Sequence, residues 1–190
     1  MLRVLLALLM AVAWGRPATM VREVELSAGW NLMSFDVQPV DGRLPEALES
    51  IAGSYELVLG FDPVLGGLTF DPELIQFSTL GEMDGQHGYW IWVSEDCALL
   101  VRGRELPERR PIQLDTGWNL ISYLPDEARP VEEALRSIEG RYLLVRGSEP
   151  GVGTVDYDPA APGGSTLQEM KPGRGYWVKM RQPGVLVYGE

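Results

Sequence analysis

The sequence contains the same unit twice. The stretch "GWNLMS" at residues 29–34 returns as "GWNLIS" at residues 117–122, and further matches follow in the same order with a shift of 87 or 88 residues. So many collinear matches indicate an internal duplication, which predicts two related folded units. The other matching pairs are "EALESIAGSYELV" (46–58) with "EALRSIEGRYLLV" (133–145), "FDP" (70–72) with "YDP" (157–159), "TLGEM" (79–83) with "TLQEM" (166–170), and "GYWIWV" (88–93) with "GYWVKM" (175–180).

The duplication sets the expected domain boundaries. We expect module 1 over residues 21–103 and module 2 over residues 112–190. The residues between them, 104–111, are charged and contain two prolines, a composition typical of a linker. Units of about 80 residues are small but able to fold alone. Whether the two modules share one core stays open.

Residues 1–15, "MLRVLLALLMAVAWG", have the pattern of a secretory signal peptide. Arg3 precedes an unbroken apolar run from Val4 to Trp14, and Ala11 and Ala13 form the small-residue pattern that a signal peptidase accepts. A permanent anchor is the alternative, but the run is shorter than the roughly 20 apolar residues that a bilayer requires. We therefore expect a secreted or cell-surface protein with no membrane span after signal cleavage.

The charge balance restricts the class of partner. The formal net charge is −11, from 16 basic and 27 acidic residues. A nucleic acid or an anionic membrane is bound by a basic surface, so neither is expected as a partner. The hydrophobic fraction of 45% is that of an ordinary globular protein.

Sequence periodicity predicts the same elements in both modules. Alternating side chains over residues 21–26 and 30–35 are typical of strands. An apolar stripe at helical spacing over residues 44–51, with Gly53 just beyond it, predicts a helix of two to three turns. Further strands are expected at residues 55–61 and at "GYW", and short connections favour antiparallel pairing. We predict β-rich α+β modules, each with five or six mostly antiparallel strands plus one short helix; an open sheet and a barrel are both compatible.

Histidine and cysteine content restricts the possible chemistry. His87 is the only histidine, its counterpart is Arg174, and no G-x-S-x-G motif is present, so a Ser-His-Asp site is disfavoured. One histidine and one cysteine also exclude zinc and iron–sulfur sites built from several such ligands. Cys97 has no intramolecular disulfide partner and is expected as a small, partly buried residue in a strand; an intermolecular disulfide is the alternative. No catalytic residue, cofactor or metal is predicted.

Acidic residues are abundant enough to raise two further possibilities. Paired carboxylates could hydrolyse a glycoside, but the acids that recur in both modules, such as Asp71 and Asp158, lie beside proline where they commonly serve turns. Calcium could be held at Asp156 and Asp158, or at Asp62 and Asp71. No regular calcium-loop series is present, so turn capping is the expectation and calcium is not.

The aromatic residues are the remaining candidates for recognition. Alternation places Trp90 and Trp92 on one face of the "GYWIWV" strand, and the second copy has Trp177 and Lys179 there. Because a position that holds Trp92 in one module and Lys179 in the other is not a core position, Trp92 is expected at the surface or at a rim. The aromatic positions that recur on this strand are expected to be structural: Tyr89, Trp90, Tyr176 and Trp177.

The Gly-Trp-Asn motif is predicted to be scaffold. Its glycine is expected to make a turn, Trp30 and Trp118 to anchor the sheet, and Asn31 and Asn119 to satisfy the turn backbone. Recognition is expected instead where the two copies differ. The candidate ligand-binding residues are His87, Trp92, Arg174 and Lys179.

"GWNLIS", followed about 60 residues later by "GYW", resembles the tandem repeats of many secreted and cell-surface proteins of bacteria. The resemblance covers residues 23–189, with Met33 as a minor departure. It implies an extracellular location and a modular, non-catalytic character.

The leading hypothesis is a secreted or cell-surface binding or adhesion module whose partner is an extracellular glycan or a surface protein. The alternative is a structural spacer without its own ligand, and a small hydrolase is third. A binding module should expose aromatic side chains around Trp92, whereas a spacer should bury every tryptophan.

Overall fold

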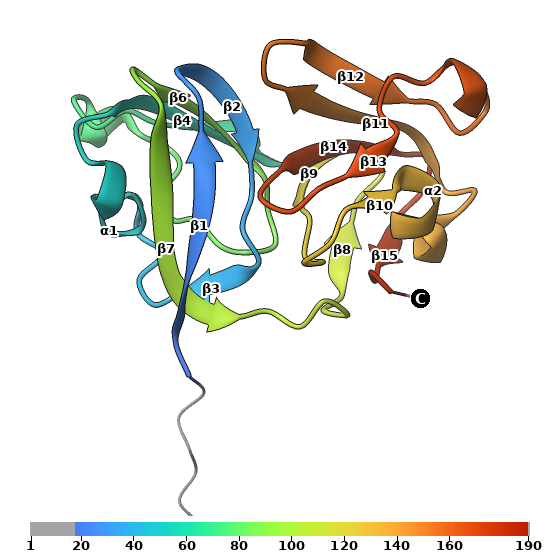
Figure 1. Cartoon of the computed structure of the whole chain (residues 1–190), viewed down its shortest axis with the longest axis horizontal. Helices are drawn as coiled ribbons and strands as arrows, with labels where there is room; N and C mark the ends of the chain where they lie inside the picture. Colours follow the sequence, from blue (N-terminus) through green and yellow to red (C-terminus); the bar gives the residue numbers. More distant parts are fainter. Residues whose placement is uncertain (1–17, 190) are drawn as a thin grey trace, which may run out of the picture.

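The computed structural model of the protein describes residues 18–189. The signal peptide expected over residues 1–15 lies outside the described residues. Modules 1 and 2 stand next to each other, with the N-terminal half on the left and the C-terminal half on the right of Figure 1. Among the described residues, no helix has the length and apolar character needed to cross a membrane.

The two modules are built from a similar succession of elements. Module 1 contains β1 (Met20–Leu26), β2 (Gly29–Met33), β3 (Val37–Pro39), α1 (Leu44–Ala47), η1 (Glu49–Ile51), β4 (Tyr55–Asp62), β5 (Gly66–Phe70), η2 (Ile75–Phe77), β6 (Tyr89–Val93) and β7 (Cys97–Glu105), where η denotes a 3-10 helix. Module 2 contains β8 (Ile112–Leu114), β9 (Gly117–Ser122), β10 (Arg129–Pro130), α2 (Val131–Ala134), η3 (Arg136–Ile138), β11 (Tyr142–Glu149), β12 (Gly153–Tyr157), η4 (Pro162–Gly164), β13 (Glu169–Met170), β14 (Gly175–Met180) and β15 (Gly184–Leu186).

Each module has a four-stranded sheet with the same order of strands. The order is β2-β6-β4-β5 in module 1 and β9-β14-β11-β12 in module 2. A second sheet, β1-β7-β3, completes module 1, and the pairs β8-β15 and β10-β13 complete module 2. All strand pairings within the described residues are antiparallel. The predicted fold class, a β-rich α+β protein of mostly antiparallel strands with short helices, is confirmed.

Each module has a core of its own. One cluster of buried side chains extends from Val24 to Val101 and the other from Leu106 to Tyr188. The inner face of each four-stranded sheet supplies fully buried residues such as Val58 and Val145. Leu106, which lies between the two predicted modules, packs into the core of module 2.

The helix in each module is shorter than the sequence suggested. In module 1 the α-helix ends after one turn at Ala47, because Leu48 has a φ of −103° and a ψ of 11°, and a 3-10 turn follows to Ile51. The apolar stripe nevertheless lies where it was predicted, since Leu44, Leu48 and Ile51 are buried in the core. Packing of this stripe, and not helix length, therefore determines the position of the segment.

Cys97 lies at the start of β7, opposite Leu26 of β1. Its side chain is partly buried against the core of module 1. The prediction of a small, partly buried strand residue is confirmed.

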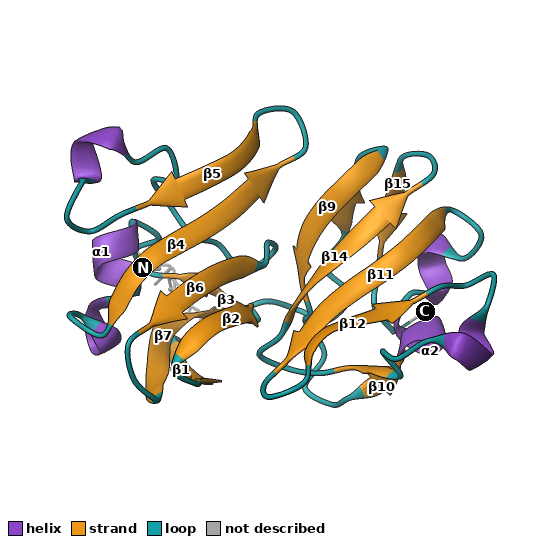
Figure 2. Cartoon of the chain, turned by 90° about the horizontal axis from the view of Figure 1, so that it is seen from above, coloured by secondary structure: helices purple, strands orange, loops and turns teal. Residues whose placement is uncertain are grey.

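The outer face of each four-stranded sheet, meaning the face turned away from its own core, is central to the site described next. Figure 2 shows these two sheets side by side, both facing the viewer. They approach each other along β2 and β4 of module 1 and along β9, β11 and β14 of module 2. Residues on the outer faces near this junction can therefore contact both modules.

Candidate functional site

The end of the first Gly-Trp-Asn strand, β2, contacts module 2. Met33 forms an isolated β-bridge with Arg174 of module 2. The Ser34 amide donates to the carbonyl oxygen of Gly173 at 3.1 Å, and the Ser34 hydroxyl donates to the carbonyl oxygen of Arg174 at 2.6 Å. Because Ser34 is fully buried, this pairing joins the two modules away from water.

The second Gly-Trp-Asn strand, β9, makes similar contacts with module 1. Ile121 forms an isolated bridge with His87 of module 1. The Ser122 amide donates to the carbonyl oxygen of Gln86 at 3.1 Å, and the Ser122 hydroxyl donates to that of Gly85 at 2.7 Å. The isolated bridges and the serine amides thus pair reciprocally, as at an interface with approximate twofold symmetry. The hydroxyls differ, because Ser34 reaches Arg174, the counterpart of His87, whereas Ser122 reaches Gly85.

The glycine of each "GYW" motif permits this close approach. A Cβ at Gly88 would lie 2.8 Å from the carbonyl oxygen of Ile121, and a Cβ at Gly175 would lie 2.7 Å from that of Met33. Contacts this short with main-chain atoms cannot be relieved by moving a side chain. The recurrence of glycine at this position is therefore explained by the junction of the modules.

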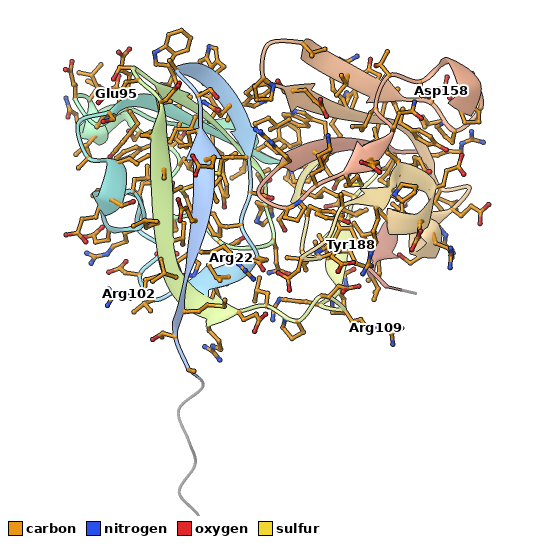
Figure 3. All side chains as sticks on the ribbon, in the orientation of Figure 1. Arg22, Glu95, Arg102, Arg109, Asp158 and Tyr188 are labelled. Carbon is orange, nitrogen blue, oxygen red and sulfur yellow. The ribbon has the colours of Figure 1, made fainter. Side chains whose placement is uncertain are left out.

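Arg22 adds ionic contacts across the junction. It lies on β1 between the two modules (Figure 3) and its guanidinium forms an ion pair with Asp36 of module 1. The same guanidinium reaches Asp126 of module 2 at 3.0 Å. One arginine therefore connects carboxylates from both halves of the chain.

The asparagine of each Gly-Trp-Asn motif braces the turn before its strand. Asn31 Oδ1 accepts from the Ser27 amide at 3.0 Å, and Nδ2 donates to the carbonyl oxygens of Ser27 at 2.7 Å and Gly29 at 3.0 Å. Asn119 makes the equivalent three bonds in module 2. Gly29 has a φ of 96°, which favours glycine. The asparagine hydrogen bonds and the glycine conformation therefore hold the turn that precedes each strand.

The tyrosine of each "GYW" motif is also structural. Tyr89 is buried and its hydroxyl accepts from the Asp84 amide at 2.8 Å. Tyr176 is buried in the same way and accepts from the Lys171 amide at 2.7 Å. Both side chains hold the turn that carries the residues of the inter-module contact.

Tryptophans cover the outer face of the sheet in module 1. The Trp30 ring lies edge-on to Trp90 at 6.2 Å and to Trp92 at 5.6 Å between ring centroids. Trp30 is 43% exposed, and both partners are half-buried. Strand alternation directs the Trp30 side chain to the outer face, where it packs on Trp90 and Trp92 of the same sheet.

Module 2 has a more polar version of this face. Trp118 lies edge-on to Trp177 at 6.0 Å. Lys179, which replaces the second strand tryptophan, places Nζ 5.5 Å from the centre of the Trp118 ring, and Arg146 lies over the same ring at 6.0 Å. The ring of Trp118, the counterpart of Trp30, is thus in contact with two cationic side chains.

A cleft of about 700 Å³ lies between the outer face of module 1 and the β11–β12 hairpin of module 2. Trp30, Leu32, Leu59 and Trp90 line it from module 1. Residues 148–154 and Arg174 line it from module 2. Within the described residues it combines indole, aliphatic and charged groups in one concave surface, as ligand sites commonly do.

The symmetry-related position in the other half is closed by an aromatic side chain. Phe61, at the end of β4, packs edge-on against Trp177 with 4.9 Å between ring centroids. The residue of module 2 that corresponds to Phe61 is Ser148, which lines the cleft beside Trp90. The two modules therefore differ at this point: an aromatic ring from the neighbouring module packs on Trp177 but not on Trp90 within the described residues.

Charged residues at the cleft also differ from their counterparts. Lys171 Nζ lies 2.9 Å from Glu149 Oε1. Arg174 forms no ion pair with any residue in the described part of the chain. The corresponding residues of module 1 are Asp84 and His87, so a carboxylate and an imidazole occupy the positions of these two cations.

His87 uses its ring within module 1. Its Nδ1 lies 2.9 Å from Asp84 Oδ1, and this hydrogen bond raises the pKa of His87 against the opposing effect of burial. Of the four predicted ligand-binding residues, Arg174 lines the cleft. His87 pairs with Asp84, Trp92 packs on Trp30, and Lys179 packs on Trp118.

The acidic turns serve their own backbone. Asp62 accepts from the amides of Val64 and Leu65, each at 2.8 Å. Asp71 accepts from two amides in the same way, and Asp158, at the outer end of module 2 (Figure 3), accepts from one. The expected turn-capping role of these carboxylates is confirmed.

Sequence comparison had pointed to the loop before "GYW" and missed two features of the cleft. Recurrence of Trp30 as Trp118 predicts a structural role but does not indicate that Trp30 also lines a cleft. The exchange of Phe61 for Ser148 lies just beyond the matched segments 46–58 and 133–145. Extending that comparison along the strand reveals the exchange.

No protein-family model, curated protein or solved structure matches this chain. The geometry of the cleft and of the outer faces is therefore the basis for assigning a function.

Proposed function

We propose that this protein is a secreted or cell-surface, non-catalytic module that binds a glycan through the tryptophans of module 1. The exposed Trp30 ring carries the proposal, because it forms one wall of a cleft that both modules build. A structural spacer would have no reason to leave this indole uncovered beside a concave surface. Secretion is supported by the sequence of residues 1–15.

The size of the aromatic contact supports weak binding. Covering the exposed part of one indole removes about 100 Å² of apolar surface, which is about 2.5 kcal/mol at the usual transfer coefficient. A free energy of about −4 kcal/mol corresponds to a dissociation constant near 1 mM. Part of the gain from covering the indole offsets the loss of translational and rotational freedom on binding, so we expect weak, millimolar affinity.

Binding is favoured over hydrolysis by the placement of the acids. Asp62, Asp71 and Asp158 are engaged by the amides of their own turns. Glu149, which lines the cleft, is paired with Lys171. A hydrolase of the usual kind needs two carboxyl groups facing each other across the substrate.

A glycan array tests the proposal with the wild-type protein and three single variants. Trp30→Ala removes a cleft wall, Trp92→Ala removes its neighbour, and Trp118→Ala removes the equivalent ring of module 2. We expect wild type to bind at least one glycan, Trp30→Ala to lose that signal, Trp92→Ala to weaken it, and Trp118→Ala to retain it. Thermal unfolding of each variant establishes that it is folded.

Two results would contradict the proposal. Absence of binding to every glycan would remove the glycan assignment and favour a protein partner or a spacer. Equal binding by wild type and Trp30→Ala would show that the tryptophan wall is not used.

A further inference from the structure

We infer that the cleft between the modules takes a six-membered sugar ring that carries a carboxylate, with the ring against Trp90 and the carboxylate on Arg174. This inference rests on the proposed function and specifies the class of glycan. It follows from a comparison of the open cleft with its closed counterpart in the same chain.

The closed counterpart shows what shape fits beside the strand tryptophan. There the Phe61 ring lies edge-on to Trp177, with 4.9 Å between centroids and 68° between planes. At the open cleft Ser148 stands in place of Phe61, and Trp90 has no ring neighbour from module 2 within the described residues. A six-membered ring of a ligand would fill the space that Phe61 fills on the other side.

The chemistry of the hairpin wall favours a sugar ring over an apolar side chain. Besides Phe61 and Ser148, two further exchanges accompany the open cleft. Val64 of module 1 corresponds to Gly151, and Gly67 corresponds to Thr154; both module 2 residues line the cleft. The hairpin thus adds the hydroxyls of Ser148 and Thr154, beside Pro150 and Val152, to a cleft lined by tryptophans from module 1. Such a mixed lining suits a ring with one apolar face and several hydroxyl groups.

The charges favour an acidic sugar. Asp84 and His87 of module 1 are replaced by Lys171 and Arg174. Glu149 pairs with Lys171. The Arg174 guanidinium has no ionic partner among the described residues, although the net charge of the protein is −11. A guanidinium matches a carboxylate in a planar, two-point arrangement, and such a bond is stronger than one between neutral groups.

Calorimetric titration tests the inference with oligosaccharides of galacturonic, glucuronic and mannuronic acid. Each is also used as its methyl ester, which keeps the ring and removes the charge. We expect at least one acid to bind, and its ester to bind about ten- to a hundredfold more weakly, as for loss of one charged hydrogen bond. Arg174→Gln should abolish the difference between acid and ester.

Variants that fill the cleft test its location. Ser148→Phe restores the ring of the closed counterpart and should abolish binding of both acid and ester. If Ser148→Phe folds poorly, Ser148→Leu fills the cleft with a smaller side chain and should also abolish binding of both acid and ester. Ala160→Phe adds the same side chain at an exposed loop of module 2 and should bind as wild type.

The outcomes separate this inference from the proposed function. Unchanged binding by both folded Ser148 variants would place the site elsewhere and overturn the inference, while glycan binding itself would stand. Equal affinity of the wild-type protein for acid and ester would overturn only the statement that the bound sugar carries a carboxylate. Binding of a short aromatic peptide that Ser148→Phe blocks, with no sugar bound, would assign the cleft to a protein and overturn both.

Discussion

The hydroxyl of Ser34 donates a hydrogen bond of 2.6 Å to the main-chain carbonyl oxygen of Arg174, which lies 140 residues further along the chain. The equivalent Ser122 makes the same kind of bond to Gly85. The most recognisable repeated motif of the sequence is thus the surface by which the two copies join. The recurrence of its serine is explained by the hydrogen bond that each copy donates to the main chain of the other module.

Ser34→Ala should reduce the free energy of unfolding by about 1–3 kcal/mol, because the change leaves buried main-chain groups without a partner. The hydroxyl also accepts from the Tyr123 amide at 3.2 Å, so two bonds are lost. Urea denaturation measures the effect. Ser94→Ala, which removes a 3.3 Å bond at an exposed position, is the control and should stay within about 0.5 kcal/mol of wild type. Equal stability of the two variants would show that the Ser34 bond does not hold the junction.

Asn31→Asp should destabilise the protein although the two side chains have nearly the same shape. The Nδ2 group donates to two carbonyl oxygens, and a carboxylate oxygen placed there would repel both of them. The loss should be about 1–3 kcal/mol, measured by urea denaturation at neutral pH. An Asn31→Asp protein as stable as wild type would mean that the turn does not depend on these two donors.

Gly88→Ala should loosen the junction, because the new Cβ would lie 2.8 Å from the Ile121 carbonyl oxygen. A cost of about 1–3 kcal/mol is typical of such overpacking. Hydrogen exchange should accelerate at the amides of Gly88 (the variant alanine) and Ser122, which bridge the modules. Gly81→Ala, with nothing within 4 Å of its Cβ, should leave exchange unchanged. Slow exchange in both variants would refute the close-approach explanation.

The His87–Asp84 pair should make stability depend on pH. The hydrogen bond that the His87 ring donates to Asp84 raises the pKa of His87. The contribution of His87 to stability is therefore complete below about pH 6.5 and is lost as the pH rises through the raised pKa. For Asp84, burial opposes ionisation, but the bonds from His87 and nearby amides outweigh it and lower the pKa. The contribution of Asp84 to stability is complete above about pH 4 and is lost as the pH falls through the lowered pKa of Asp84.

Both side chains of this pair are partly exposed, at 48% and 34%, so the effect should be below about 1 kcal/mol. Urea denaturation of wild type and His87→Gln at about pH 5.5 and about pH 8 isolates it. The stability advantage of wild type should be larger at the lower pH. An advantage that is the same at both values, or larger at the higher one, would contradict the sign.

The fold class could be predicted because strand alternation and short connections are local patterns of the sequence. Alternation also placed Trp90 and Trp92 on one face of their strand correctly. The junction could not be predicted, since a buried serine such as Ser34 is explained only by main chain from the other module. The cleft could not be predicted for the same reason, because it is lined by Ser148 of module 2 and Trp90 of module 1.

The most direct test of the cleft as the binding site is an NMR titration that follows the indole N–H signals of the tryptophans. The two modules serve as each other's control, because Trp30 and Trp90 line the open cleft while Trp177 is covered by Phe61 and Trp118 by two cations. With an acidic oligosaccharide that binds, the signals of Trp30 and Trp90 should shift and those of Trp118 and Trp177 should not. Shifts confined to Trp118 and Trp177, or equal shifts in both modules, would contradict the assignment of the cleft.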